Sequence, residues 1–257
     1  MANLKKLLNQ NLPTVGTRIY SRWGVVTEAV GAAGGYDYVE FLAEYAPFSQ
    51  EDLEHIAMAA ELHNLDSIIK IDYQNRGYVA QKAVAAGFTG VLFTDCHNVQ
   101  EVEESIRYIT PDTPEDKGLF GCPSRRFTHF GGAGNAAYIE MVRNLVVGVM
   151  IEKKGAMDDI EAILSNPRVD FIQWGPTDYS MNIGVAPRKT APEVRDVEIK
   201  LWELCQKYNK PFRAEVGDVA DAQFYLDLGV KHFNMGDELS NNMRYWRTNA
   251  AGLREKL

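Results

Sequence analysis

The chain of 257 residues lacks most features that would place it outside the class of compact globular proteins. Its three cysteines, Cys96, Cys122 and Cys205, are far apart and odd in number. They predict neither a disulfide framework nor a zinc site, and they are typical of the reducing cytoplasm, where we expect the protein. No apolar run approaches the roughly 18 residues of a membrane span. Residues 1–8 are amphipathic and lack a following cleavage site, so they predict a short helix over one end of the fold and not a signal peptide.

Positive charge is also scarce. The chain has 27 Lys and Arg residues against 35 Asp and Glu residues, which gives a net charge of −8, and the basic residues form no stripe. Nucleic acids and anionic membranes are therefore not expected partners. The hydrophobic content is 46% with no compositional break, and the length suits one TIM barrel of about 250 residues. We expect residues 1–257 to form a single domain.

Short apolar segments alternate eight times with segments of helical spacing. The predicted strands lie in 14–19, 38–42, 67–71, 90–94, 145–152, 170–178, 211–216 and 232–235. The predicted helices are 23–33, 50–64, 78–86, 99–108, 153–167, 192–208, 219–228 and one after Gly236. This alternation is typical of an α/β fold with parallel strands, and eight units predict a closed (β/α)8 TIM barrel. Only 110–134, which is rich in Pro and Gly, interrupts the rhythm, and a loop of that length is usually functional.

Two acidic residues follow neighbouring buried strands of this pattern. Glu152 ends the apolar run 145–151, and Asp178 follows the run 171–174 after a Gly-Pro-Thr turn. Because a helix connects the two strands, both carboxylates are expected at the C-terminal edge, where parallel barrels bind ligands. Adjacent carboxylates repel each other unless a cation lies between them, and Mg²⁺ or Mn²⁺ completed by water and substrate oxygens suits such a pair. The alternative is that each residue only caps the helix that follows it.

Three motifs extend this interpretation: Glu44-x-Ala46-Pro47, Ile151-Glu152-x-x-x-Ala156-Met157 and Gly175-Pro176-x-Asp178-x-Ser180-x-x-x-Gly184. With them the chain resembles, over nearly its whole length, the HpcH/HpaI aldolases. These are metal-dependent class II enzymes that cleave 2-oxo-4-hydroxy acids to pyruvate or hydroxypyruvate and an aldehyde. The resemblance implies that Glu152 and Asp178 bind a divalent metal (Mg²⁺, Mn²⁺ or Co²⁺). It also implies that the turn Gly175-Pro176-Thr177 receives the substrate carboxylate.

Among the departures of the chain from the family pattern, two fall at positions that bear directly on the reaction. Tyr45 stands where the family usually has a proton-transferring His, and Lys70 stands where it has an Arg that holds the oxo-acid oxygens. A tyrosine with an ordinary pKa of about 10 is a poor base at neutral pH, and a lysine supplies a point charge but no bidentate fork. Lys70 is therefore expected to neutralise an enolate, with a Schiff base or a plain salt bridge as alternatives. Tyr45 is either a donor to substrate or a packed aromatic residue.

Other polar residues have open roles. His129, in the long loop with Arg125 and Arg126, is the best-placed substitute base if that loop folds over the barrel mouth. Arg18 and Glu215 are candidates for substrate contact, with surface pairing and helix capping as their alternatives. Glu44 is expected to hold metal-bound water. Glu40, inside the second predicted strand, needs a partner, as a structural ion pair or a catalytic group.

Together these residues predict a divalent-metal-dependent carbon–carbon lyase. Its substrates would be a small-molecule 2-oxo acid and an aldehyde, joined or separated through a pyruvate-type enolate. A decarboxylase or isomerase on the same metal site and a non-catalytic oxo-acid-binding barrel remain alternatives. The resemblance further implies a homohexamer, a trimer of dimers, in which the apolar residues of the final helix pack on a neighbouring subunit. Packing on the same chain is the alternative for that helix.

Overall fold

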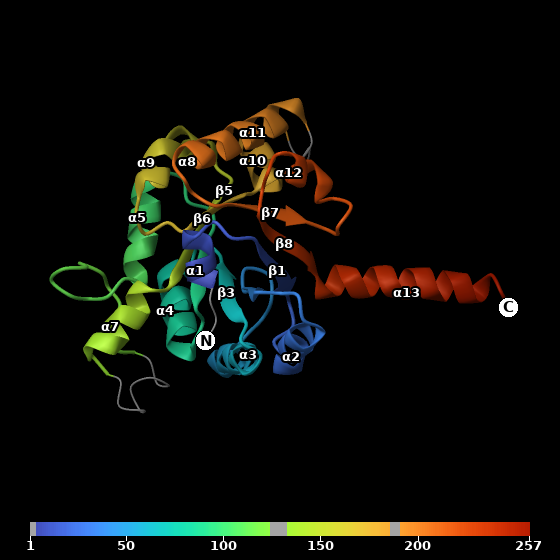
Figure 1. The fold of residues 1–257 in the computed structure, drawn as a ribbon, viewed down its shortest axis with the longest axis horizontal. Helices are drawn as coiled ribbons and strands as arrows, with labels where there is room; N and C mark the ends of the chain where they lie inside the picture. Colours follow the sequence, from blue (N-terminus) through green and yellow to red (C-terminus); the bar gives the residue numbers. More distant parts are fainter. Residues whose placement is uncertain (1–3, 124–132, 186–190) are drawn as a thin grey trace.

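The computed structural model describes residues 4–123, 133–185 and 191–257. Its centre is a closed barrel of eight parallel strands in sequence order (Figure 1). The strands are β1 (Thr14–Ile19), β2 (Tyr38–Leu42), β3 (Asp66–Ile71), β4 (Gly90–Phe93), β5 (Val146–Ile151), β6 (Phe171–Trp174), β7 (Phe212–Val216) and β8 (His232–Asp237). The pairing of β1 with β8 closes the barrel, which confirms the predicted (β/α)8 architecture.

Helices surround the barrel and follow most strands. They are α1 (Leu4–Asn9), α2 (Gly24–Ala33), α3 (Gln50–Leu62), α4 (Arg76–Ala86), α5 (Val99–Tyr108), α7 (Ala136–Arg143), α8 (Lys154–Asp158), α9 (Ile160–Ser165), α10 (Pro176–Asn182), α11 (Pro192–Lys207), α12 (Gln223–Asp227) and α13 (Glu238–Arg254). Local signals set several ends: Ser49 forms a capping box with Asp52, and Gly87 ends α4 at φ +114°.

The sequence was misleading at three places outside the barrel itself. The predicted helix 153–167 is broken at Asp159 into α8 and α9, although its apolar side chains keep helical spacing. Helix α7 was not predicted, because it lies directly after the Pro- and Gly-rich segment, where Asn135 caps it. Helix α10 begins at Pro176, within the Gly-Pro-Thr segment that the sequence predicts as a turn. Pro176 at its start has no backbone N–H to lose, so the helix begins immediately after β6.

The N-terminal end of the barrel is closed by packing. Leu4 and Leu8 of α1 belong to a buried cluster with Tyr38, Phe171 and four other barrel residues. Two glycines make room for the large rings: a Cβ at Gly16 would lie 2.1 Å from the Tyr38 ring, and one at Gly148 would lie 2.2 Å from the Phe171 ring. The described part of the predicted N-terminal helix therefore covers one end of the barrel.

The last helix differs from the others. α13 leaves the barrel after β8 and extends away from it (Figure 1), and none of its residues is buried. Its exposed apolar side chains are Leu239, Met243, Tyr245, Trp246 and Leu253. Its first residue is anchored, because Glu238 accepts hydrogen bonds from the backbone of Tyr20 and Ser21. Across the described ranges, no helix has both the length and the apolar character needed to cross a bilayer.

Candidate active site

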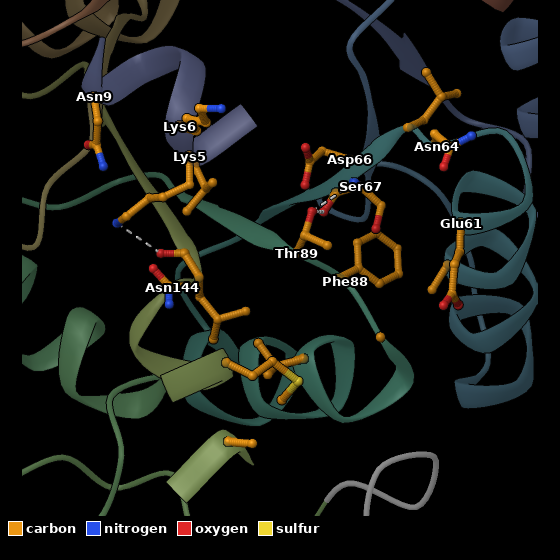
Figure 2. A pocket seen from close by; sticks show the side chains of 18 of the residues that line it. Lys5, Lys6, Asn9, Glu61, Asn64, Asp66, Ser67, Phe88, Thr89 and Asn144 are labelled. Carbon is orange, nitrogen blue, oxygen red and sulfur yellow. Dashed lines mark hydrogen bonds between the residues drawn. The ribbon is translucent and has the colours of Figure 1, made fainter. Parts of the chain in front are cut away.

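Cavities lie at both ends of the barrel. The larger, about 1140 Å³, is at the N-terminal end between α1 and the starts of β3 and β4 (Figure 2). No residue predicted to have a functional role lines it. The other cavity, about 330 Å³, is at the C-terminal mouth and contains both predicted metal ligands. Since ligands of parallel barrels bind at the C-terminal ends of the strands, the smaller cavity is the candidate active site.

The mouth brings together residues that the sequence had indicated separately. Those lining the cavity are Tyr45, Lys70, Glu152, Gly175, Pro176, Thr177, Asp178 and Glu215. They come from the ends of five strands or from the turns directly after them, so the closure of the barrel and not local sequence places them side by side. Glu44 contacts the cavity residue Lys70, and Arg18 contacts Glu215. His129 lies outside the described residues, as do Arg125 and Arg126.

Glu152 is a buried carboxylate with little compensation. Its side chain follows β5 directly, is 3% exposed and accepts one backbone hydrogen bond, from the N–H of Asp95 at 2.7 Å. Gly175 allows it this position, because a Cβ there would lie 2.7 Å from Glu152 Oε2. Burial is the main cause that raises the pKa of Glu152 to about 7; the N–H of Asp95 and the charge of Lys70 oppose the shift, and the charges of Asp95 and Asp178 add to it. The donors and positive charge near the carboxylate thus compensate its burial only in part.

Lys70, at the end of β3, sits in a compact group with Glu44 and Tyr45. Its Nζ lies 2.7 Å from Glu44 Oε2 and donates to the Tyr45 hydroxyl at 2.9 Å. Burial alone would lower the pKa of Lys70, but Glu44 and then Tyr45 outweigh it, so the pKa is raised. Burial also raises the pKa of Tyr45 to about 12, although Lys70 opposes the shift. At neutral pH this group therefore holds an ammonium and a protonated phenol.

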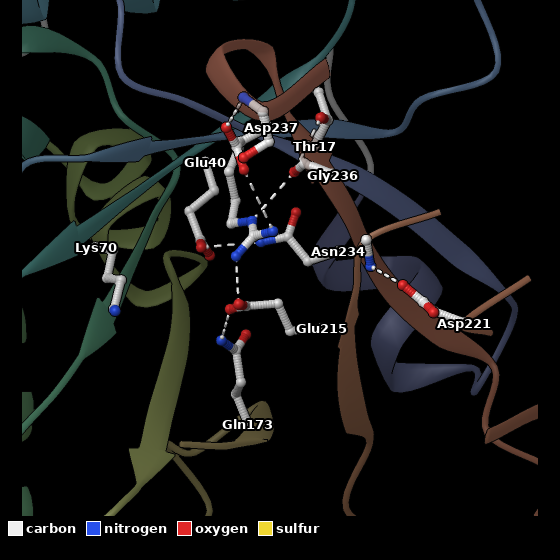
Figure 3. A network of polar contacts seen from close by, with 12 residues as sticks. Thr17, Glu40, Lys70, Gln173, Glu215, Asp221, Asn234, Gly236 and Asp237 are labelled. Atoms are coloured by element: carbon white, nitrogen blue, oxygen red, sulfur yellow. Dashed lines mark hydrogen bonds and ion pairs between the residues drawn. The ribbon is translucent and has the colours of Figure 1, made fainter. Parts of the chain in front are cut away.

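Beneath the mouth lies an ion pair inside the barrel. Arg213 of β7 pairs with Glu40 of β2, and both side chains are almost completely buried. Glu40 also accepts a hydrogen bond from Asn234 Nδ2 at 2.9 Å (Figure 3). Of the two roles open for Glu40, the structure shows the ion pair. Sequence reasoning missed Arg213, although two charged residues at inward positions of different predicted strands were a signal for this pair.

A second set of contacts connects that ion pair with the mouth. Arg213 Nε donates to Gln173 Oε1 at 2.6 Å, and Gln173 Nε2 donates to Glu215 Oε2 at 2.9 Å. Glu215 in turn pairs with Arg18, whose Nε donates to the carbonyl of Gly236 at 3.1 Å. Figure 3 shows Lys70 to one side of this network. Glu215 faces the cavity while Arg18 reaches it only through Glu215.

The donor set fits a hard divalent ion. Mg²⁺ is usually held by one or two carboxylates, with water and substrate oxygens at its other positions. Glu152 and Asp178, which both line the cavity, could supply two such carboxylates, and the incompletely compensated burial of Glu152 favours a cation there. In residues 4–123, 133–185 and 191–257, no three acidic, histidine or cysteine side chains converge. The described residues therefore do not form the closed cage typical of structural zinc.

Proteins of known name are similar to this chain in sequence. The 5-keto-4-deoxy-D-glucarate aldolase of Klebsiella pneumoniae subsp. pneumoniae is 24% identical over 216 residues, which cover 84% of this chain and 82% of that enzyme. The enzyme of the same name from Enterobacter sp. (strain 638) is 23% identical over 215 residues, with the same coverage.

Solved structures agree on the fold. An HpcH/HpaI aldolase/citrate lyase family protein from Burkholderia cenocepacia J2315 has a TM-score of 0.89 at 22% identity, covering 99% of this chain and 100% of the other. Macrophomate synthase has a TM-score of 0.85 at 18% identity, covering 98% and 88%. The family model described as HpcH/HpaI aldolase/citrate lyase matches residues 30–241, and it supports a carbon–carbon lyase in general. The chain belongs to the HpcH/HpaI aldolase/citrate lyase family.

Proposed function

We propose that this protein is a divalent-metal-dependent carbon–carbon lyase that cleaves or forms a 2-oxo-4-hydroxy acid. The observation that carries the proposal is that Glu152, Asp178, Lys70 and Tyr45 line one cavity at the barrel mouth. The relatives named 5-keto-4-deoxy-D-glucarate aldolase support the substrate class, because a 5-keto group beside a terminal carboxylate is a 2-oxo acid.

The residues nearest the carboxylate pair would bind the oxo-acid end of the substrate. An ion held by Glu152 and Asp178 would polarise the carboxylate and keto oxygens as a Lewis acid. At the adjoining turn, Gly175 N–H already donates to the Ile151 carbonyl at 3.0 Å, and Pro176 has no N–H. Thr177, in the first turn of α10, is the remaining donor of the three for the substrate carboxylate.

Lys70 would stabilise the negative charge of the enolate, and Tyr45 would donate a proton to the substrate. A protonated Lys70, fixed by Glu44, stabilises negative charge on the enolate oxygen, and as a protonated amine it is not the nucleophile for a Schiff base. The Tyr45 hydroxyl accepts a hydrogen bond from Lys70 and also shares a hydrogen bond with the Glu44 carboxylate. Tyr45 would therefore exchange its contact with Glu44 for one with the 4-oxygen of the substrate when it donates its proton. Glu215, which faces the cavity, would contact hydroxyls of the aldehyde portion, and Arg18 would hold Glu215 in place.

One observation favours a second candidate function. Aldol cleavage needs a base for the 4-hydroxyl proton, and the raised pKa of Tyr45 leaves it a donor at neutral pH. Decarboxylation of a 2-oxo diacid needs a cation to receive the electrons and an acid to protonate the enolate, but no base at a substrate hydroxyl. His129 stays a prediction as the missing base for the aldol reaction.

Turnover by the purified protein separates these functions. Mg²⁺, Mn²⁺ or Co²⁺ is added with a panel of 2-oxo-4-hydroxy acids and 2-oxo diacids, and pyruvate or hydroxypyruvate, aldehyde and CO₂ are measured together, with a chelator control. Pyruvate with an equal amount of aldehyde, lost on chelation, supports the aldolase. CO₂ without aldehyde supports the decarboxylase. Tight 2-oxo acid binding without any product points to a non-catalytic barrel.

The shape of α13 supports the proposal that the protein is a homo-oligomer. A helix of 17 residues with no buried residue and several exposed apolar side chains is stabilised by packing on another surface. We propose a second copy of the chain as that surface, in a hexamer built as a trimer of dimers. Light scattering of the full chain and of Trp246→Glu tests this, and a monomeric full chain would contradict it.

The buried free thiols of Cys96 and Cys205 suit the proposed cytoplasmic location.

A further inference from the structure

One lysine lies next to the proposed metal ligands. Lys153 follows Glu152 in the sequence, and its Nζ lies 2.6 Å from Asp95 Oδ1 and 4.0 Å from Asp178 Oδ1. The Lys153 side chain is only 12% exposed. Its ammonium therefore lies between the carboxylates of Asp95 and Asp178, although neither motif spacing nor the predicted site had indicated it.

The surrounding loops hold this lysine in place. Asp95, just after β4, has the positive φ of +55°, and its N–H donates to Glu152 while its carboxylate holds Lys153. The first turn of α8 is packed tightly on the loop after β4, since a Cβ at Gly155 would lie 2.3 Å from the carbonyl oxygen of His97. Lys153 is thus tied to the site and is not a solvent-exposed side chain that happens to approach it.

Most charged side chains around Lys153 have a partner of opposite charge. Lys70 is paired with Glu44, and Lys153 with Asp95. Glu152 and Asp178 remain, with a formal charge of −2 that one divalent ion would balance. The second contact of Lys153 falls on one of these two, at 4.0 Å, a distance at which a fixed positive charge weakens the attraction of the carboxylate for another cation.

We propose that Lys153 is a built-in competitor for the Asp178 carboxylate, which limits the affinity of the site for its divalent ion. The inference rests on the proposed function, since it concerns the same carboxylate pair. Lys153 acts through Asp178 and Asp95 and is therefore a positioning residue. Its conservative replacement by arginine keeps the charge, whereas methionine keeps most of the length and removes the charge.

The test is calorimetric titration of the purified, chelator-treated protein with Mn²⁺ alone. Lys153→Met is expected to bind Mn²⁺ about tenfold more tightly than the unsubstituted protein, because one nearby positive charge is removed. Lys153→Arg is expected to stay within about twofold of the unsubstituted protein. The matched control is Lys154→Met: this neighbouring lysine is 62% exposed and pairs with Asp158 at 2.6 Å, so its loss leaves the Mn²⁺ affinity unchanged.

The outcomes separate this inference from the proposed function. Tighter binding in Lys153→Met, or binding gained there when the unsubstituted protein shows none, supports it, because structural damage does not tighten a site. Unchanged or weaker binding in a folded Lys153→Met overturns the inference and leaves the metal site intact. No Mn²⁺ binding in any variant overturns both. If Lys153→Met does not fold, Lys153→Gln replaces it under the same criteria.

Discussion

Acidic residues at the two ends of the barrel have opposite environments. At the N-terminal end, Asp170 accepts the N–H of Val147 at 2.7 Å and binds Lys5 at 2.6 Å. Asp66 there accepts the N–H of Leu4 at 2.6 Å. At the C-terminal mouth, buried Glu152 has one N–H donor, and burial raises its pKa to about 7. Compensated carboxylates fasten the chain together, whereas an uncompensated one is available to a ligand.

The volume of a cavity does not indicate which end of this barrel binds a ligand. The cavity at the N-terminal end is the larger of the two, yet Asp66, which lines it, already accepts the N–H of Leu4 from α1. The mouth cavity has less than a third of that volume but holds the charges that a ligand would complete. Substitutions at the mouth should therefore change function with little loss of stability, and substitutions at the other end should do the reverse.

The largest effect is expected at Glu152. Glu152→Gln removes a proposed metal ligand, so Mn²⁺ binding should be lost and kcat/KM should fall on the order of a thousandfold. Folding should not suffer, because the substitution also removes a buried charge. Calorimetry, turnover and urea denaturation of the same sample check all three. Turnover retained without metal would remove the basis of the proposed function.

Lys70 should come next. Lys70→Met takes away the cation proposed to stabilise the enolate, and kcat should fall about a hundredfold while Mn²⁺ still binds. Lys82→Met is the control, because Lys82 lies over the Tyr78 ring away from the mouth. An equal effect of the two substitutions on kcat would show that Lys70 has no special role.

The opposite end supplies the reverse test. Asp170→Asn weakens the contact with Lys5 and with the N–H of Val147, and it should lower the free energy of unfolding by about 2 kcal/mol. Mn²⁺ affinity and kcat should not change. Urea denaturation next to steady-state kinetics checks this prediction. A loss of activity in Asp170→Asn without a loss of stability would contradict the division into a stabilising N-terminal end and a functional C-terminal mouth.

Tyr45 is expected to contribute less than Lys70. Tyr45→Phe keeps the ring and removes the hydroxyl, so a hydrogen bond to the substrate oxygen is lost and kcat should fall about tenfold. Tyr20→Phe is a matched control, because its ring lies 6.3 Å from that of Tyr45 but does not line the cavity. If the two variants have the same kcat, Tyr45 is a packed aromatic residue and not a donor.

The predictable part of the fold is the part with local causes. Seven of the eight strands were predicted to within one or two residues, because buried parallel strands are short apolar runs. The helix ends at Ser49 and Gly87 also have local causes, a capping box and a glycine with positive φ. The break at Asp159 and the short α10 have no such signal: apolar spacing continues across the break, and Gly-Pro-Thr reads equally as a turn.

The candidate active site also has a part that the sequence predicts and a part that it does not. Glu152 follows β5 directly and Asp178 lies in the first turn of α10, soon after β6, so strand order alone predicted that they lie together at one edge. Arg213 and Glu40 meet across the barrel, from β7 and β2, and Lys153 meets Asp95 because β5 pairs with β4. Such contacts depend on barrel closure and on the register between strands. Neither can be derived from a single sequence.

The smallest expected effect is a dependence of the unfolding free energy on pH. It tests whether Glu152 is less well compensated than the acids at the N-terminal end. The folded-state pKa of Glu152, about 7, lies above its ordinary value of 4.5. The cost of burying the ionised form is therefore complete above pH 7 and is relieved as the pH falls from 7 toward 4.5. In chelator, the unsubstituted protein should gain about 1 kcal/mol in unfolding free energy between pH 8 and pH 6 relative to Glu152→Gln. Saturating Mn²⁺ should remove that gain, because an ion stabilises the charged carboxylate. Equal pH profiles of the two proteins in chelator would mean that Glu152 is as well compensated as Asp170.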